Sequence, residues 1–292
     1  MCAAHDKGTE LAQTSNIGAV GFGLLSATSW GSGDFCGGLA ARRAPIYSVI
    51  ITSQLIGWIT LLTGAILLGQ TVPPLEHLLW GGVAGLSGAV GLMVLYYGLA
   101  NGQMAVVAPV SAVVSTIVPV LIGIGISGVP SGWKLLGFVI AMVSVWFISR
   151  SENTKIGLRA LALPVLAGLS FGLFFVITSR VSYVSYIYPL VAARSASIPV
   201  FIMIALLRRE RLLVPRATFP IAIGSGILDA GGNLFFVLSS EVGGRVDVAA
   251  VLGSLFPAAT ILLARVVLKE KIGRMQTVGI AMAFVAILLI SA

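Results

Sequence analysis

The sequence predicts an all-α integral membrane protein whose ten transmembrane helices form two inverted five-helix repeats. Hydrophobic residues make up 58% of the 292 residues and charged residues only 10%, far from the composition of soluble domains. The uncharged stretches 44–75 and 78–133 are long enough for one and two apolar helices, since about 20 apolar residues span a bilayer. The two halves of the chain also resemble each other.

The internal repeat is clearest at the end of each half. Segment 254–291 contains an apolar stretch with Pro257, a short charged break and a second apolar stretch, and segment 115–149 follows the same plan with Pro119. Two further pairs of segments correspond upstream: 231–240 with 91–100, and 29–31 with 170–172. The chain is therefore one unit of roughly 140 residues written twice.

In order along the chain, a polar tail precedes ten spans. We expect the tail, residues 1–16, to be frayed; it lacks the basic start and cleavage site of a signal peptide. The first repeat covers 17–149, a connecting loop covers 150–158, and the second repeat covers 159–292. The expected spans are 17–40, 45–69, 78–100, 104–128 and 131–149, then 159–179, 186–207, 217–239, 247–268 and 273–291.

Because each repeat has an odd number of spans, the two repeats enter the membrane in opposite orientations. Inverted repeats are the construction of many secondary transporters, whose substrate site lies near the midplane between the repeats. The links between spans are too short for a soluble domain, so the function must be carried out inside the bilayer. We therefore predict a secondary transporter that works by alternating access and is driven by proton coupling or solute exchange.

Three segments are similar to a known family: SATSWGSGDF (26–35), LYYGLANGQMAVVAPVSAVVSTIVPVL (95–121) and LKEKIGRMQTVGIAMAFVAILL (268–289). In this order and spacing the chain resembles the drug/metabolite transporter superfamily, in particular its EamA-type permeases, over nearly its whole length. One departure is that the family's acidic residue before the fifth helix is present as Glu270 in the second repeat and absent from the first. The resemblance implies a transporter, commonly an exporter of amino acids, metabolites or drugs.

Ionisable side chains within the spans mark the candidate substrate site. Placing one at the centre of a membrane helix costs about 2.5–3.5 kcal/mol, so such a side chain usually faces a cavity or a partner. Asp34, Arg194 and Asp229 lie in the first, seventh and eighth spans. Trp30 and Asn233 lie one turn from Asp34 and Asp229, respectively, on the same helix faces.

Aromatic residues complete the predicted site. Trp30 and Tyr97 are the rings that we assign to substrate binding, together with the three charged residues and Asn233. Phe171 and Phe175 fall where the two repeats would converge, but we interpret them as packing residues. The predicted substrate-binding set is thus Trp30, Asp34, Tyr97, Arg194, Asp229 and Asn233.

The charged residues have two interpretations, and the sequence leaves both open. In the first, Arg194 and an aspartate form a structural ion pair that holds helices together. In the second, Arg194 binds an anionic group of the substrate, such as a carboxylate, through a fork of hydrogen bonds. Asp34 or Asp229 would then hold an amine or carry the coupling proton, because a carboxyl group shielded from water releases its proton less readily.

The sequence gives little support for an enzyme. Gly85-Leu86-Ser87-Gly88 matches a motif of intramembrane serine proteases, which need a histidine base, but His5 and His77 lie in the tail and at a helix entrance. Two cysteines without metal-ligand spacing indicate neither a disulfide framework nor a metal site, and we expect no cofactor. The net charge of +8 comes from residues at span ends, which favours lipid headgroups over nucleic acid as partners.

We expect a monomer or homodimer in a bacterial plasma membrane, with a small-molecule substrate. Most of the 18 Lys and Arg residues flank the links after odd-numbered spans, which places both termini outside by the positive-inside rule. Members of the resembled superfamily are usually drawn with both termini in the cytoplasm, so we predict only that the termini share one side.

The alternative to a transporter is a non-transporting membrane scaffold or a lipid-handling protein, including a lipid flippase. A transporter requires Asp34, Arg194 and Asp229 to converge on one cavity between the repeats. A scaffold would satisfy them as isolated pairs without a central cavity, and a flippase would have a cavity that opens sideways to lipid.

Overall fold

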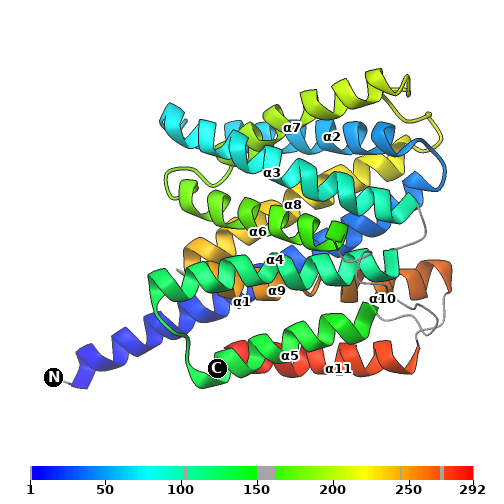
Figure 1. The fold of residues 1–292 in the computed structure, drawn as a ribbon. Coiled ribbons are helices and arrows are strands. Elements are labelled where there is room, and N and C mark those ends of the chain that lie inside the picture. The colour runs from blue at the N-terminus through cyan, green and yellow to red at the C-terminus, as the bar shows by residue number, and fades with distance from the viewer. Residues whose placement is uncertain (1, 101–103, 150–161, 244, 270–272, 292) are drawn as a thin grey trace.

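The computed structural model describes residues 2–100, 104–149, 162–243, 245–269 and 273–291. Within these ranges the chain forms eleven α-helices and no strands. Those of the first half are α1 (Cys2–Ala41), α2 (Ile46–Leu67), α3 (Leu75–Ala100), α4 (Met104–Ser127) and α5 (Gly132–Ser149). Those of the second half are α6 (Ala162–Val181), α7 (Tyr188–Leu207), α8 (Phe219–Gly243), α9 (Val246–Gly253), α10 (Phe256–Leu268) and α11 (Arg274–Ser291). Figure 1 shows them packed side by side in one bundle.

The N-terminal stretch differs from the sequence prediction. α1 begins at Cys2, so the tail that we expected to be frayed is helical from its second residue. Its composition explains the difference, because Ala3, Glu10 and Leu11 are among the better helix formers and no proline interrupts the stretch. Figure 1 shows this part of α1 projecting beyond the bundle.

The ninth expected span, 247–268, is also different, since it consists of two helices. α9 ends at Gly253 and α10 begins at Phe256. Pro257 explains the break, because its ring clashes with the carbonyl group four residues earlier, which belongs to Gly253. Pro119, its counterpart in the first repeat, lies inside the continuous helix α4. The two repeats are therefore not identical at this position.

Six helical segments of the described chain are long and apolar enough to cross a membrane. They are Ile46–Leu67, Leu75–Leu95, Ala162–Val181, Tyr188–Leu207, Phe219–Gly243 and the combined segment Val246–Leu268. Three shorter apolar helices are Ser111–Ser127, Gly132–Phe147 and Arg274–Ile290. α1 belongs to neither group, because Thr28, Ser32 and Asp34 lower its hydropathy. This composition is that of an integral membrane protein with one comparatively polar helix.

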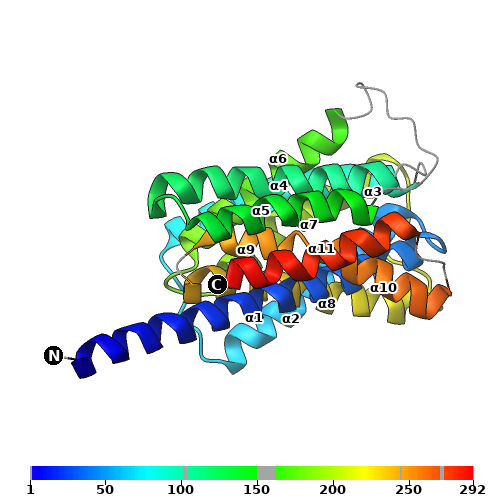
Figure 2. The same cartoon turned by 90° about the horizontal axis from the view of Figure 1, so that it is seen from below.

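The helix packing follows the twofold repeat of the sequence. α1 packs along α8, and α3 packs along α6, which is the equivalent pair with the repeats exchanged. The contact of α4 with α6 likewise has an equivalent. It is the contact of α1 with α9 and α10, which correspond to α4 in the second repeat. α5 and α11 are equivalent helices that lie side by side and run in opposite directions (Figures 1 and 2). The largest helix–helix contacts therefore join one repeat to the other.

Glycines bring the two repeats into backbone contact. A Cβ atom added at Gly85 would lie 2.0 Å from the carbonyl oxygen of Ala193, so α3 touches α7 directly. A Cβ atom at Gly226 would lie 2.4 Å from the carbonyl oxygen of Ser53, so α8 touches α2 in the same manner. Small residues at such crossings are typical of membrane helices. Gly85, which belongs to the protease-like motif, is thus a packing residue.

We predict that Gly85→Ala lowers the thermal unfolding midpoint of the purified protein by several degrees. The added methyl group would overlap the α7 backbone, and overpacking of this kind costs about 1–3 kcal/mol. The matched control is Gly125→Ala in α4, where an added Cβ atom meets nothing within 4 Å. Equal midpoints for the two variants in a thermal-shift measurement would contradict the assigned contact.

Candidate functional site

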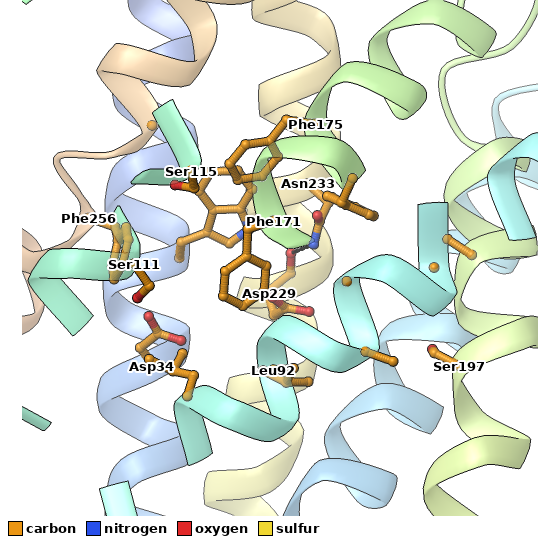
Figure 3. A pocket seen from close by; sticks show the side chains of 18 of the residues that line it. Asp34, Leu92, Ser111, Ser115, Phe171, Phe175, Ser197, Asp229, Asn233 and Phe256 are labelled. Carbon is orange, nitrogen blue, oxygen red and sulfur yellow. Dashed lines mark hydrogen bonds between the residues drawn. The ribbon is translucent and has the colours of Figure 1, made fainter. Parts of the chain in front are cut away.

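A cavity of about 130 Å³ lies between the two repeats. Its walls come from α1 to α4 of the first half and from α6 to α10 of the second, whereas none of its lining residues belongs to α5 or α11. An engineered apolar cavity of similar size, about 150 Å³, binds benzene. The cavity therefore has room for a group the size of one aromatic ring. Figure 3 shows the side chains around it.

Arg194 is the polar centre of the cavity and joins three helices. From α7, its Nη2 donates to Oδ2 of Asp229 on α8 at 2.5 Å, and its Nη1 donates to Oε1 of Gln54 on α2. The Arg194 side chain is only 7% exposed, whereas that of Asp229 is 38% exposed. The ion pair thus consists of a buried cation and a carboxylate that opens onto the cavity.

Gly57 and Asn233 help to position the two partners of this ion pair. Gly57 on α2 makes room for the guanidinium group, because a Cβ atom there would lie 2.9 Å from Cζ of Arg194. On α8, Nδ2 of Asn233 donates to the backbone carbonyl oxygen of Asp229 at 2.7 Å. The position of Asp229 is therefore determined by its own helix as well as by its partner.

Asp34 lines the cavity from α1. Ser225 Oγ donates to the carbonyl oxygen of Gly33 at 3.0 Å, and a Cβ atom at Gly33 would lie 3.2 Å from the amide nitrogen of Asp229. α1 and α8 therefore touch immediately beside Asp34, which sets where its side chain enters. In Figure 3 the Asp34 carboxyl group lies near Ser111 and Phe256, apart from Asp229. Within the described chain, no hydrogen bond or salt bridge joins Asp34 to another side chain.

An aromatic cluster forms another wall. Trp30 stacks on Phe175 with a centroid distance of 5.2 Å, and Phe236 lies 5.8 Å from Trp30 and 4.7 Å from Phe175. Phe236 is fully buried, while Trp30 and Phe175 line the cavity. Gly232 lets the indole approach α8, because a Cβ atom there would lie 2.4 Å from Trp30 Cδ1. The cluster connects α1, α6 and α8 through ring contacts.

The structure brings together five of the six predicted site residues. These five residues line the cavity: Trp30, Asp34, Arg194, Asp229 and Asn233. Tyr97 belongs to α3, but its side chain lies outside the described residues. The three charged residues thus converge between the repeats, as a transporter requires. Their role in binding a substrate remains a prediction.

Sequence reasoning missed several lining residues. Gln54 could have been found, since it is an amide within a long uncharged span and such groups need a partner. Ser254 and Phe256 could not, because they reach the cavity only through the break between α9 and α10. Phe171, which we interpreted as a packing residue, also lines the cavity.

A second ion pair, also missed, lies away from the cavity. Arg245 Nη2 donates to Asp247 Oδ2 at 2.7 Å, and the same nitrogen donates to the carbonyl oxygen of Gly128 at 3.1 Å. The Asp247 side chain is 0% exposed. This pair ties the end of α4 to the start of α9. This pair is an isolated structural pair, because its carboxylate is enclosed by protein. The Arg194–Asp229 pair differs, because its carboxylate lines the cavity.

These features define a class of protein. Apolar helices in two equivalent halves, with buried charges gathered around one cavity between them, form the architecture of an integral membrane transporter. The profile of the EamA-like transporter family matches residues 17–150 and again residues 158–292. The chain therefore belongs to the EamA-like transporter family, and each half is one copy of the family's unit. The resemblance seen in the sequence motifs is confirmed.

Comparison with solved structures agrees on the fold. One solved structure, described only as "Crystal structure of protein", superposes with a TM-score of 0.78 at 13% sequence identity. The similarity covers 93% of this chain and 97% of the other. No curated protein matches the chain significantly. Among the described residues, no group of three or more His, Cys, Asp or Glu side chains could hold a metal ion.

We predict that Asp247→Asn destabilises the protein more than Asp229→Asn does. The Asp247 side chain is 0% exposed and accepts hydrogen bonds from Arg245 and from the backbone N–H of Val248, so an asparagine there breaks a charge-assisted contact at an enclosed position. Breaking a buried pair by removing one partner costs about 3–5 kcal/mol. Asp229 faces the cavity, where water can solvate Arg194 after the substitution, so the loss is smaller. Thermal unfolding of both variants in the same detergent measures the difference. A larger decrease for Asp229→Asn would contradict the distinction between the two pairs.

Proposed function

We propose that the protein is a secondary transporter that exports a small metabolite, such as an amino acid or an amphipathic drug, by alternating access. Ten segments would cross the membrane as two inverted repeats, with α9 and α10 together forming the ninth. The observation that carries the proposal is the convergence of Asp34, Arg194 and Asp229 on one cavity that both repeats line.

Equivalent contacts in the two repeats support alternating access. Trp30 on α1 rests against Gly232 on α8, and Phe171 on α6 rests against Gly91 on α3, where an added Cβ atom would lie 2.8 Å from the ring. Trp30 and Phe171 occupy corresponding positions in the internal repeat and both line the cavity. In the proposed cycle, one of these equivalent contacts loosens while the other tightens, so that the two repeats exchange conformations.

The Arg194–Asp229 pair offers a route to coupling. A proton bound to Asp229 would remove its negative charge and weaken its hold on Arg194, so protonation and the arrangement of α7 and α8 would depend on each other. A substrate group that competes for either partner would have the same effect, which corresponds to solute exchange. Asp34 is the second carboxylate that could carry a proton through the cavity.

The scaffold alternative fits the observations less well. A scaffold has no use for a cavity and would enclose its carboxylates as Asp247 is enclosed beside Arg245. In the cavity, by contrast, Asp229 is partly exposed and Asp34 has neither a hydrogen bond nor a salt bridge among the described residues. An ionisable side chain without a partner is expensive in a membrane and usually marks a functional site.

The proposal is tested by flux in proteoliposomes loaded with labelled amino acids or cationic drugs. We expect saturable flux in the parent protein and a decrease of at least about tenfold in Arg194→Ala and in Asp229→Asn, since each loses a charge-assisted hydrogen bond. Glu76→Gln, an exposed carboxylate at the start of α3, is the matched control and should retain flux. Flux that survives both cavity substitutions in folded protein would rule out the assigned site.

Proton coupling gives a separate prediction. If Asp34 or Asp229 carries the proton, its replacement by asparagine should abolish the response of flux to an imposed pH gradient. Exchange of labelled for unlabelled substrate without a gradient should fall in that variant by no more than its loss of substrate binding, because exchange requires only binding and the conformational change. A pH response unchanged in both Asp34→Asn and Asp229→Asn would exclude these carboxylates as the proton carriers.

A further inference from the structure

The described lining of the cavity has more carboxyl groups than cationic groups. Three ionisable side chains occur among its described lining residues, namely Asp34, Arg194 and Asp229. Arg194 is neutralised by Asp229 and donates a further hydrogen bond to Gln54. When all three side chains are ionised, the charge of Asp34 is left over.

Asp34 differs from the other aspartates that the structure describes inside the bundle. Asp229 has Arg194 as its partner, and Asp247 has Arg245 together with the backbone N–H of Val248. Asp34 has no such partner among the described residues, and the nearby charge acting on it is the like charge of Asp229. Because a charge removed from water needs a counter-charge or hydrogen bonds, the space beside Asp34 favours a positively charged ligand.

The surroundings of this space suit a cation attached to an apolar body. Trp30 lies one helical turn from Asp34 on the same helix, and Phe171 and Phe256 line the cavity as well. Figure 3 shows the Phe256 ring on the same side of the cavity as the Asp34 carboxyl group. Aromatic faces attract cations, tryptophan most strongly, and they also pack against an aromatic or aliphatic body. A carboxylate beside such rings is a recognition site for ammonium groups.

An anionic ligand fits the same cavity poorly. It would have to displace Asp229 from the Arg194 side chain, which is only 7% exposed and already bonded on two sides. After that displacement, Asp34 and Asp229 would both be carboxylates without a cation. We propose, building on the transport function above, that the substrate is an amphipathic organic cation. It would consist of an ammonium group held by Asp34 and an apolar body about the size of one ring held by the aromatic wall.

Four probes with one ring each separate charge from shape: benzylamine, benzyltrimethylammonium, benzyl alcohol and benzoate. Binding to the purified full-length protein in detergent is measured by isothermal titration calorimetry. We expect both cations to bind at least tenfold more tightly than the alcohol, and benzoate to bind more weakly still. Benzyltrimethylammonium is decisive, because it keeps its charge at every pH and donates no N–H hydrogen bond.

Matched variants assign the effect to Asp34. Asp34→Asn should lose at least tenfold in affinity for benzyltrimethylammonium, whereas Asp34→Glu, which keeps the charge, should retain most of it. Glu76→Gln removes an exposed carboxylate outside the cavity and should leave the affinity unchanged. Size-exclusion chromatography verifies that each variant is folded.

Three results would overturn the proposal: benzoate or benzyl alcohol binding as tightly as the cations, undiminished cation binding by Asp34→Asn, or no binding of any probe. The flux measurement distinguishes failure of the cation proposal from failure of the proposed transport function. Saturable flux of anionic or neutral solutes without flux of cations would reject the substrate class and leave the transporter standing. Cation binding without flux of any solute would reject the transport function.

Discussion

Each half of this protein packs mainly against the other half. The extensive contacts of α1 with α8, α3 with α6 and α5 with α11 all cross between the halves. Because lipid is as apolar as the helix surfaces, close packing has to replace the hydrophobic effect, and glycines such as Gly85 and Gly226 provide it through backbone contact. The cavity lies within these contacts between the halves, and residues of both repeats therefore line it.

The buried charges show how the same interaction can have two roles. Asp247 is fully enclosed and binds an arginine that also holds the end of α4, so this pair fastens one helix to another. Arg194 is buried to a similar degree, yet its partner Asp229 opens onto the cavity. An ion pair can change partners only where a ligand or water can replace one of them. Access to the cavity, more than the pair itself, makes Arg194 and Asp229 candidates for function.

Much of the fold could be predicted from the sequence, because hydropathy and internal repetition are properties of the linear chain. The expected spans 45–69 and 186–207 correspond closely to α2 and α7. The helical start of α1 and the break between α9 and α10 were missed. The helical start of α1 depends on weak local propensities. The break between α9 and α10 occurs at Pro257, whereas its counterpart Pro119 lies within an unbroken helix. A proline at corresponding positions of the two repeats can therefore leave one helix continuous and interrupt the other.

The sequence by itself determined that the chain is a duplicated membrane protein and that Asp34, Arg194 and Asp229 lie within its helices, since apolar length and intervening charges are local features. Only the tertiary structure decided which of the two aspartates pairs with Arg194. The answer depends on how α1, α2, α7 and α8 cross, and hence on close contacts at Gly33, Gly57 and Gly226. Those crossings bring Gln54 to the arginine and leave Asp34 without a counter-charge, because the distance between side chains on different helices is a property of their packing.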